Sequence, residues 1–178
     1  MALVTHTTTD WQALDSAHFL HPFTDHKALH AAGSRIIERA DGIYLWDSDG
    51  NRILDGMAGL WCVNIGYGRS ELAEAARHQM QVLPYYNTFF QTAHPPVIEL
   101  SQLLAEVTPE RLNHAFFTNS GSESVETALK IALAYHRARG DGQRTRLIGR
   151  ERGYHGVNFG GISVGGISGN RKTFGQML

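Results

Sequence analysis

The run Ser120-Gly121-Ser122 has the residue types of a phosphate-binding loop, between the apolar segment 114–118 and a stretch with helical periodicity. Glycine lets a backbone approach a ligand closely, and the first N–H groups of a helix have no intrahelical partner, so they can bind an anion. The same residues also form an ordinary capping box, Ser120-x-x-Glu123, which satisfies such groups without a ligand. Taken alone, the segment supports a phosphate cradle and a plain helix cap about equally.

A second candidate group is Tyr154-His155-Gly156, which follows a strand predicted over residues 146–149. Ligands of open α/β sheets bind at the carboxyl ends of the strands, so this turn is expected at the same edge as the loop 120–122. An aromatic ring there can stack on a planar ligand whose phosphate the loop holds. For Tyr154 considered singly, packing over the end of the sheet is the simpler interpretation.

Two patterns resemble metal sites but lack a required residue. Residues 47–51 begin like a calcium loop, yet Arg52 stands where that loop needs glycine, so a hairpin turn is the better interpretation. His26 and His30 have the spacing of a helical zinc pair but lack the glutamate of the zinc-protease motif. We therefore expect no metal site.

Local patterns predict the elements that position these residues. Residues 1–34 are expected to form an N-terminal arm with one short helix around Asp10–Ala17. Three strand-like runs separated by Asp-Gly turns within residues 35–55 predict a small antiparallel meander. The glycine-rich residues 56–68 are expected to form a loop.

The remainder alternates helices and strands. Helices are expected over residues 71–81, over 95–107, and from the serine loop to about Arg139, and strands over 114–118 and 146–149. This β-α-β order predicts an α/β fold with a mainly parallel sheet covered by helices.

The expected domain organisation has three parts. Residues 1–34 form the arm, residues 35–66 a meander that contributes to a small domain, and residues 67–178 the first part of a large cofactor-binding domain. Only about two strands of the parallel sheet precede Leu178, so we expect the sheet to be completed by sequence beyond it.

Composition excludes several classes of protein. The 178 residues are 42% hydrophobic and 19% charged with a net charge of −1, which is typical of a globular protein without a nucleic-acid or membrane partner. The chain lacks a secretory signal and any apolar run of the ~20 residues that span a bilayer. The single cysteine, Cys62, is interpreted as a small buried thiol in a reducing compartment. These features predict a cytoplasmic protein.

Five motifs occur together in an order and spacing that resemble one family. They are His21-Pro-Phe-Thr24, Gly56-Met-Ala-Gly-Leu-Trp61, Gly66-Tyr-Gly68, Asn119-Ser-Gly-Ser-Glu-Ser124 and Tyr154-His-Gly156. From about residue 20 onward the chain is similar to class III pyridoxal-phosphate-dependent aminotransferases, the omega-aminotransferases. The resemblance is greatest to the branch that moves amino groups between omega-amino acids or amines and pyruvate. Each motif is common alone, but five in register are specific.

The resemblance implies a truncated fold type I transferase domain that binds pyridoxal 5'-phosphate. Ser120, Gly121 and Ser122 would bind the cofactor phosphate, and Tyr154 would stack on the pyridine ring. The family's catalytic lysine, which forms the Schiff base with the cofactor, would lie beyond Leu178.

The resemblance also implies an aromatic substrate pocket. Trp61 and Phe23 would form its wall, and Phe89 would reach the active site of a partner subunit. The expected assembly is a homodimer or a dimer of dimers, with an amine or omega-amino acid as donor and a keto acid as acceptor.

The implied function is transfer of an amino group to a keto acid such as pyruvate, by the full-length protein. None of Lys27, Lys130 and Lys172 lies in the family's lysine motif, so the 178-residue chain alone is expected to be inactive. Two alternatives stay open at this point. One is another pyridoxal-phosphate enzyme of the same fold, such as a decarboxylase or an aminomutase, and the other is a non-catalytic phosphate-binding fragment.

Overall fold

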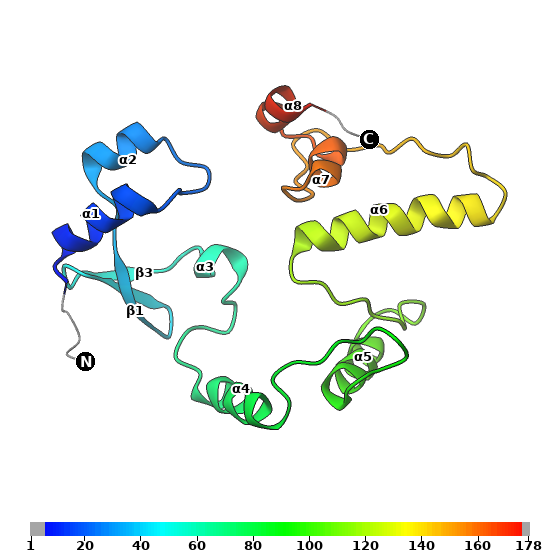
Figure 1. Ribbon diagram of the computed structural model, residues 1–178, viewed down its shortest axis with the longest axis horizontal. Coiled ribbons are helices and arrows are strands. Elements are labelled where there is room, and N and C mark those ends of the chain that lie inside the picture. Colours follow the sequence, from blue (N-terminus) through cyan, green and yellow to red (C-terminus); the bar gives the residue numbers. More distant parts are fainter. Residues whose placement is uncertain (1–5, 176–178) are drawn as a thin grey trace. The chain divides into compact units, whose positions relative to one another are not determined.

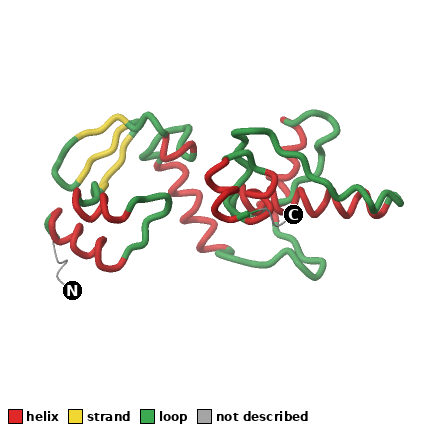
Figure 2. Tube along the Cα trace, turned by 90° about the horizontal axis from the view of Figure 1, so that it is seen from above, coloured by secondary structure: helices red, strands yellow, loops and turns green. Residues whose placement is uncertain are grey.

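The computed structural model describes residues 6–175, which form eight helices and three strands (Figure 1). The chain divides into two compact units, Met1–Tyr86 and Asn87–Leu178, and each is described by itself. The first unit contains the only sheet among the described residues, and the second is built from helices and extended segments (Figure 2).

The first helix of the arm is held by its own side chains. Helix α1, Thr8–His18, begins with a capping box in which the Thr7 hydroxyl accepts from the Asp10 N–H at 3.2 Å. The Asp10 carboxylate in turn accepts from the Thr7 N–H at 2.8 Å. A reciprocal pair of this kind fixes where a helix starts, and the short helix predicted around Asp10–Ala17 is confirmed.

A second helix in the arm was not predicted. Helix α2, His26–Ala32, starts at Asp25, whose carboxylate accepts from the N–H groups of Lys27 at 3.0 Å and Ala28 at 3.2 Å. It ends at Gly33, whose φ of 76° suits glycine. With seven residues it is too short to show periodicity, and only its two ends carry a signal.

The predicted meander is confirmed. Strands β1 (Ile37–Asp41), β2 (Tyr44–Asp47) and β3 (Arg52–Leu54) form an antiparallel sheet in the order β1-β2-β3. The pairing of β1 with β2 shifts register between Ile37 and Arg39, so edge strand β1 carries a bulge-like irregularity.

The turn between β2 and β3 is organised by the buried carboxylate of Asp47. It accepts from the Asn51 N–H at 2.8 Å and the Asp49 N–H at 3.2 Å. Burial by itself raises the pKa of Asp47, but the hydrogen bonds from Asn51 and Asp49 and the charge of Arg35 outweigh it, and the pKa lies below its usual value. The segment that begins like a calcium loop is thus a hairpin turn.

Six further helices follow the meander, and three of them were predicted. Helices α4, Ser70–Val82, α5, Pro95–Val107, and α6, Gly121–Ala138, agree with the predicted spans. Three short helices lie in segments with no predicted helix: α3, Ala58–Trp61, α7, Phe159–Val164, and α8, Ser168–Phe174.

The two strands predicted over residues 114–118 and 146–149 are not formed within the described residues. A strand is defined by its ladder of hydrogen bonds to a neighbour, and neither segment has such a partner here. The described residues therefore form a mixed α/β arrangement whose sheet is the antiparallel meander, and the expected parallel pairing between these two segments is absent.

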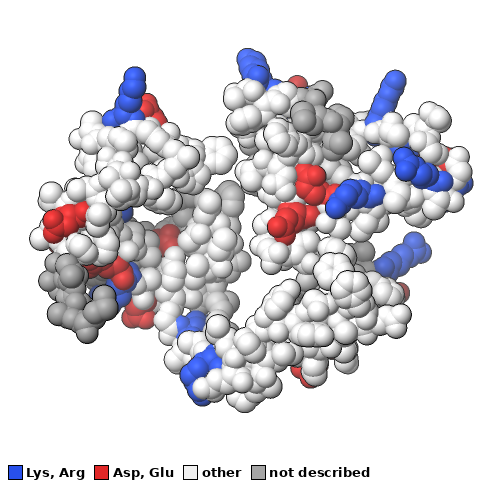
Figure 3. Space-filling model, viewed as in Figure 1, with Lys and Arg blue, Asp and Glu red and all other residues white. Residues whose placement is uncertain are grey.

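Little apolar surface is buried within either unit. Ile162 and Val164 are the only buried hydrophobic side chains among residues 6–175, while large apolar side chains on α4, α5 and α6 are exposed. Charged side chains of both signs are scattered over the face drawn in Figure 3, in keeping with a net charge of −1. None of the helices in this part of the chain is both long and apolar enough to cross a bilayer.

We expect the 178-residue chain expressed alone to be insoluble or poorly folded. Exposed apolar helix faces and extended segments without strand partners both promote aggregation. The measurement is the soluble fraction after expression, followed by thermal unfolding monitored by circular dichroism. A cooperative unfolding transition of a monomer would contradict this expectation.

Candidate functional site

The loop before α6 caps the helix with the side chains of Ser120 and Glu123. The Ser120 hydroxyl accepts from the Glu123 N–H at 3.2 Å, and the Glu123 carboxylate accepts from the Asn119 N–H at 2.8 Å. Ser120 itself is extended, with φ −154° and ψ 161°, as a residue before a helix usually is. Ser120 thus caps the helix with its side chain, but the reciprocal capping box is not formed, because the Glu123 carboxylate binds the N–H of Asn119 and not that of Ser120.

These two capping contacts leave two N–H groups unused. No hydrogen bond within the described part of the chain engages the N–H of Gly121 or of Ser122. A Cβ atom built on Gly121 would meet no heavy atom within 4 Å, so the space beside this residue is open. Cap and cradle are thus compatible, because the cap uses Asn119 and Glu123 and leaves the first two N–H groups of α6 available to an anion.

The loop after Tyr154 packs directly against the start of α6. The Val157 N–H donates to the Ser122 hydroxyl oxygen at 3.0 Å, which leaves the hydroxyl proton free to be donated elsewhere. A Cβ atom on Gly156 would lie 2.9 Å from the Ser122 Cα, and the φ of Gly156 is 112°. Only glycine permits this approach and this backbone conformation. The structure thus brings the loop of Tyr154 to the serine loop, although the parallel sheet at whose edge the two loops were predicted to meet is not formed within the described residues.

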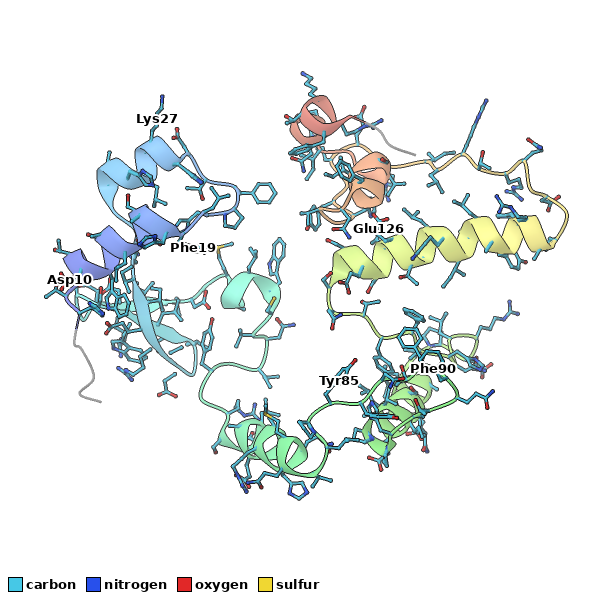
Figure 4. All side chains as sticks on the ribbon, viewed as in Figure 1. Asp10, Phe19, Lys27, Tyr85, Phe90 and Glu126 are labelled. Atoms are coloured by element: carbon cyan, nitrogen blue, oxygen red, sulfur yellow. The ribbon has the colours of Figure 1, made fainter. Side chains whose placement is uncertain are left out.

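A second contact fixes the same junction. Glu126, on the second turn of α6, accepts from the Gly161 N–H at 3.1 Å (Figure 4). Tyr154 borders a small pocket together with Gly156 and Ile162. Its side chain is 60% exposed and has no aromatic partner among the described residues, so a ring face is accessible for stacking.

The three aromatic residues assigned to a substrate pocket are all strongly exposed. Phe23 is 86% exposed, Trp61 79% and Phe89 72%. Phe23 and Trp61 lie in the first unit and Phe89 in the second. Phe23 and Trp61 have positive φ angles of 49° and 63°, and Phe89 directly precedes Phe90, whose φ is 56°. Left-handed backbone is uncommon for residues other than glycine and often marks functional loops.

Trp61 ends a single helical turn of reversed hand. The φ angles of Ala58–Trp61 run from 46° to 67°, and the Trp61 N–H donates to the Met57 carbonyl at 2.8 Å. A left-handed turn costs roughly 1–2 kcal/mol for each residue that carries a Cβ atom. The sequence predicted a loop here, and only Gly59 gave any sign of this conformation.

The carboxylate of Asp55 holds this turn. It accepts from the Tyr67 hydroxyl at 2.7 Å, the Gly59 N–H at 2.8 Å and the Met57 N–H at 3.2 Å. The hydroxyl of Tyr67 first, and then the Gly59 N–H, lower the pKa of Asp55, while Asp55 raises the pKa of Tyr67. The sequence analysis did not single out Asp55, and it named Tyr67 only within the motif Gly66-Tyr-Gly68 without a role, because their contact depends on how the loop folds back.

Cys62 follows the same turn and is exposed, so the expectation of a buried thiol is wrong. Its thiol donates to the Leu60 carbonyl at 3.4 Å.

The sequence of this chain is similar to that of known aminotransferases. Residues 26–178 match the model of the aminotransferase class-III family. The chain is 56% identical over 160 residues to a putrescine–pyruvate aminotransferase of Pseudomonas aeruginosa, which covers 90% of this chain and 35% of that protein. It is 50% identical over 169 residues to an omega-aminotransferase of Caulobacter vibrioides, which covers 95% of this chain and 38% of that protein.

Solved structures agree with these relatives. The crystal structure of an (S)-enantioselective omega-transaminase from Thermomicrobium roseum superposes with a TM-score of 0.94 at 44% identity. The match covers 98% of this chain and 39% of that one. The chain therefore spans little more than a third of the length of the proteins it matches.

Titration of Asp55 provides a test of the contacts around the turn. Because its pKa is lowered in the fold, the carboxylate stabilises the turn above its ordinary pKa of about 4, and this contribution is lost as the pH falls through the lowered value. Carboxyl NMR should therefore give a pKa below the ordinary value, and Tyr67→Phe should raise it. An unchanged pKa in the Tyr67→Phe protein would show that the hydroxyl is not the main cause.

Proposed function

Because the chain belongs to the class III aminotransferases, we propose that it serves in an enzyme that transfers an amino group from an omega-amino acid or amine to a keto acid such as pyruvate. The observation that carries this proposal is the pair of unused N–H groups of Gly121 and Ser122, adjacent to the loop of Tyr154. The names of the relatives, which include a putrescine–pyruvate and an omega-aminotransferase, support the choice of substrates.

Pyridoxal 5'-phosphate fits the residues at the start of α6. Two free N–H groups and the proton of the Ser122 hydroxyl offer donors to a phosphate, and the dipole of this 18-residue helix favours negative charge at its first turn. The exposed ring of Tyr154 suits stacking on a planar pyridine. When bound, this cofactor supplies the electron sink that amino-group transfer requires.

The residues proposed to bind the cofactor then have distinct roles. Ser120, Gly121 and Ser122 bind the phosphate and so fix the position of the cofactor, while Tyr154 sets the plane of its ring. The proton transfers require a lysine that we place beyond Leu178, because Lys27, Lys130 and Lys172 lie outside the motif of the family's lysine.

The substrate pocket is proposed to be aromatic. Trp61 and Phe23 form its wall, and Phe89 enters the active site of a partner subunit in a homodimer or dimer of dimers. Aromatic walls suit amines with apolar bodies, since burial of apolar surface contributes about 25 cal/mol per Å². We also propose a cytoplasmic enzyme in which residues 35–66 contribute to a small domain and residues 67–178 begin the cofactor-binding domain.

The activity is tested on a protein of the relatives' length that contains this chain. With pyruvate as acceptor and beta-alanine, putrescine or an arylalkylamine as donor, we expect formation of alanine, measured by chromatography. A protein that binds pyridoxal phosphate but forms no alanine from any donor would instead indicate another reaction of the same fold.

The phosphate cradle is tested by removing one N–H group. Gly121→Pro deletes an N–H that no described residue uses, at the helix position where proline is best tolerated, and the extended Ser120 before it accommodates proline. We expect roughly 10- to 100-fold weaker binding of both pyridoxal phosphate and inorganic phosphate to the apoprotein, the effect of losing one hydrogen bond to a charged group. Calorimetric titration measures both affinities.

The comparison variant is Gly121→Ala, which keeps the N–H group and adds a methyl group, so that its loss of affinity measures the steric effect alone and the further loss in Gly121→Pro measures the N–H group. Equal phosphate affinities of the proline and alanine variants would contradict the assignment of this N–H to the phosphate. Circular dichroism checks that the helix content of the two variants is the same.

A further inference from the structure

The left-handed turn that carries Trp61 does not form by its own preference. Three of its four residues, Ala58, Leu60 and Trp61, have a Cβ atom that disfavours this conformation. Apolar burial does not compensate, because Leu60 and Trp61 are both exposed. Polar contacts from outside the turn therefore add to its own backbone hydrogen bonds in maintaining it.

Those contacts converge on Asp55. Its carboxylate binds the N–H groups of Met57 and Gly59, which lie just before and inside the turn. An acceptor that binds two N–H groups two residues apart fixes the direction in which the backbone enters the turn. The orientation of Trp61, two residues further on, depends on that direction.

Tyr67 holds the other side of the turn. Its hydroxyl donates to the Asp55 carboxylate at 2.7 Å. A Cβ atom built on Gly59 would lie 3.1 Å from the Tyr67 hydroxyl oxygen. The main chain of Tyr67 is paired with Gly42, at the turn between β1 and β2, by hydrogen bonds of 2.8 and 3.3 Å. A continuous series of contacts thus links the sheet to Tyr67, to Asp55 and to the turn (α3 in Figure 1).

We propose that Asp55 and Tyr67 are positioning residues that set the orientation of Trp61 and thereby determine which amines the enzyme accepts. This inference rests on the proposed role of Trp61 as a wall of the substrate pocket. Trp61 is assigned to the body of the amine and not to its reacting carbon. The two positioning residues therefore act on the discrimination between amines more than on the rate of the reaction itself.

The test uses the full-length holoenzyme and two donors, a bulky arylalkylamine and a small aliphatic amine. Tyr67→Phe removes one hydroxyl and keeps the ring. We expect it to change the ratio of kcat/KM for the two donors by roughly three- to tenfold, mainly through KM, with kcat for the small amine within about twofold of the original. Trp61→Ala should change the ratio by more.

The double variant separates positioning from general structural damage. If Tyr67 acts through Trp61, adding Tyr67→Phe to Trp61→Ala causes no further change in the ratio, because the group being positioned is gone. A second series compares Asp55→Ala with Asp55→Asn. The asparagine oxygen still accepts from the Gly59 N–H, so it should restore part of the discrimination that alanine loses.

The control is Tyr135→Phe, which removes a hydroxyl that accepts from Arg139 at 2.7 Å on α6 and should leave the ratio unchanged. If Trp61→Ala does not change the ratio, the pocket role proposed for Trp61 fails. If Trp61→Ala changes it and Tyr67→Phe does not, the positioning inference alone is overturned. An equal effect of Tyr67→Phe with and without Trp61 overturns it as well.

Discussion

The contact between Ser122 and the Gly156–Val157 segment is the constraint on which the candidate cofactor site depends. It joins residues 35 positions apart, the first turn of α6 and the loop that carries Tyr154. Gly156 makes this contact possible, because only glycine tolerates both a φ of 112° and an approach of 2.9 Å between its Cβ position and the Ser122 Cα. The capping contacts of Ser120 and Glu123 complete the arrangement, because they fix the start of the helix without using the N–H groups assigned to phosphate.

Sequence patterns predicted the elements whose stability is local. Helix α1, the meander, and helices α4 to α6 follow from capping residues, Asp-Gly turns and apolar periodicity, all of which act over a few residues. The segments 114–118 and 146–149 were predicted as strands because they are short and apolar, but a strand needs a neighbour, and the described residues supply none. Helices α2, α7 and α8 are too short for a periodic pattern.

The residues of the candidate site also fall into those that the sequence could indicate and those that it could not. The serine loop and Tyr154 could be identified because glycine, serine and aromatic residues in a fixed order indicate a type of chemistry. Asp55 could not, since an aspartate after a strand has many ordinary explanations and its partner Tyr67 is 12 residues away. Nor did the sequence indicate that Trp61 sits on left-handed backbone, because alanine, leucine and tryptophan all disfavour that conformation.

The irregular pairing of β1 affects whether a strand of another chain can pair with this edge of the meander. A regular edge strand is a template on which a foreign strand can be added, and proteins often interrupt such edges with bulges and charged residues. Strand β1 has both features, since its register shifts between Ile37 and Arg39 and three of its five residues are charged. This edge is thus a poor site for sheet extension, and recruitment of a foreign strand is disfavoured even though the sheet itself is small.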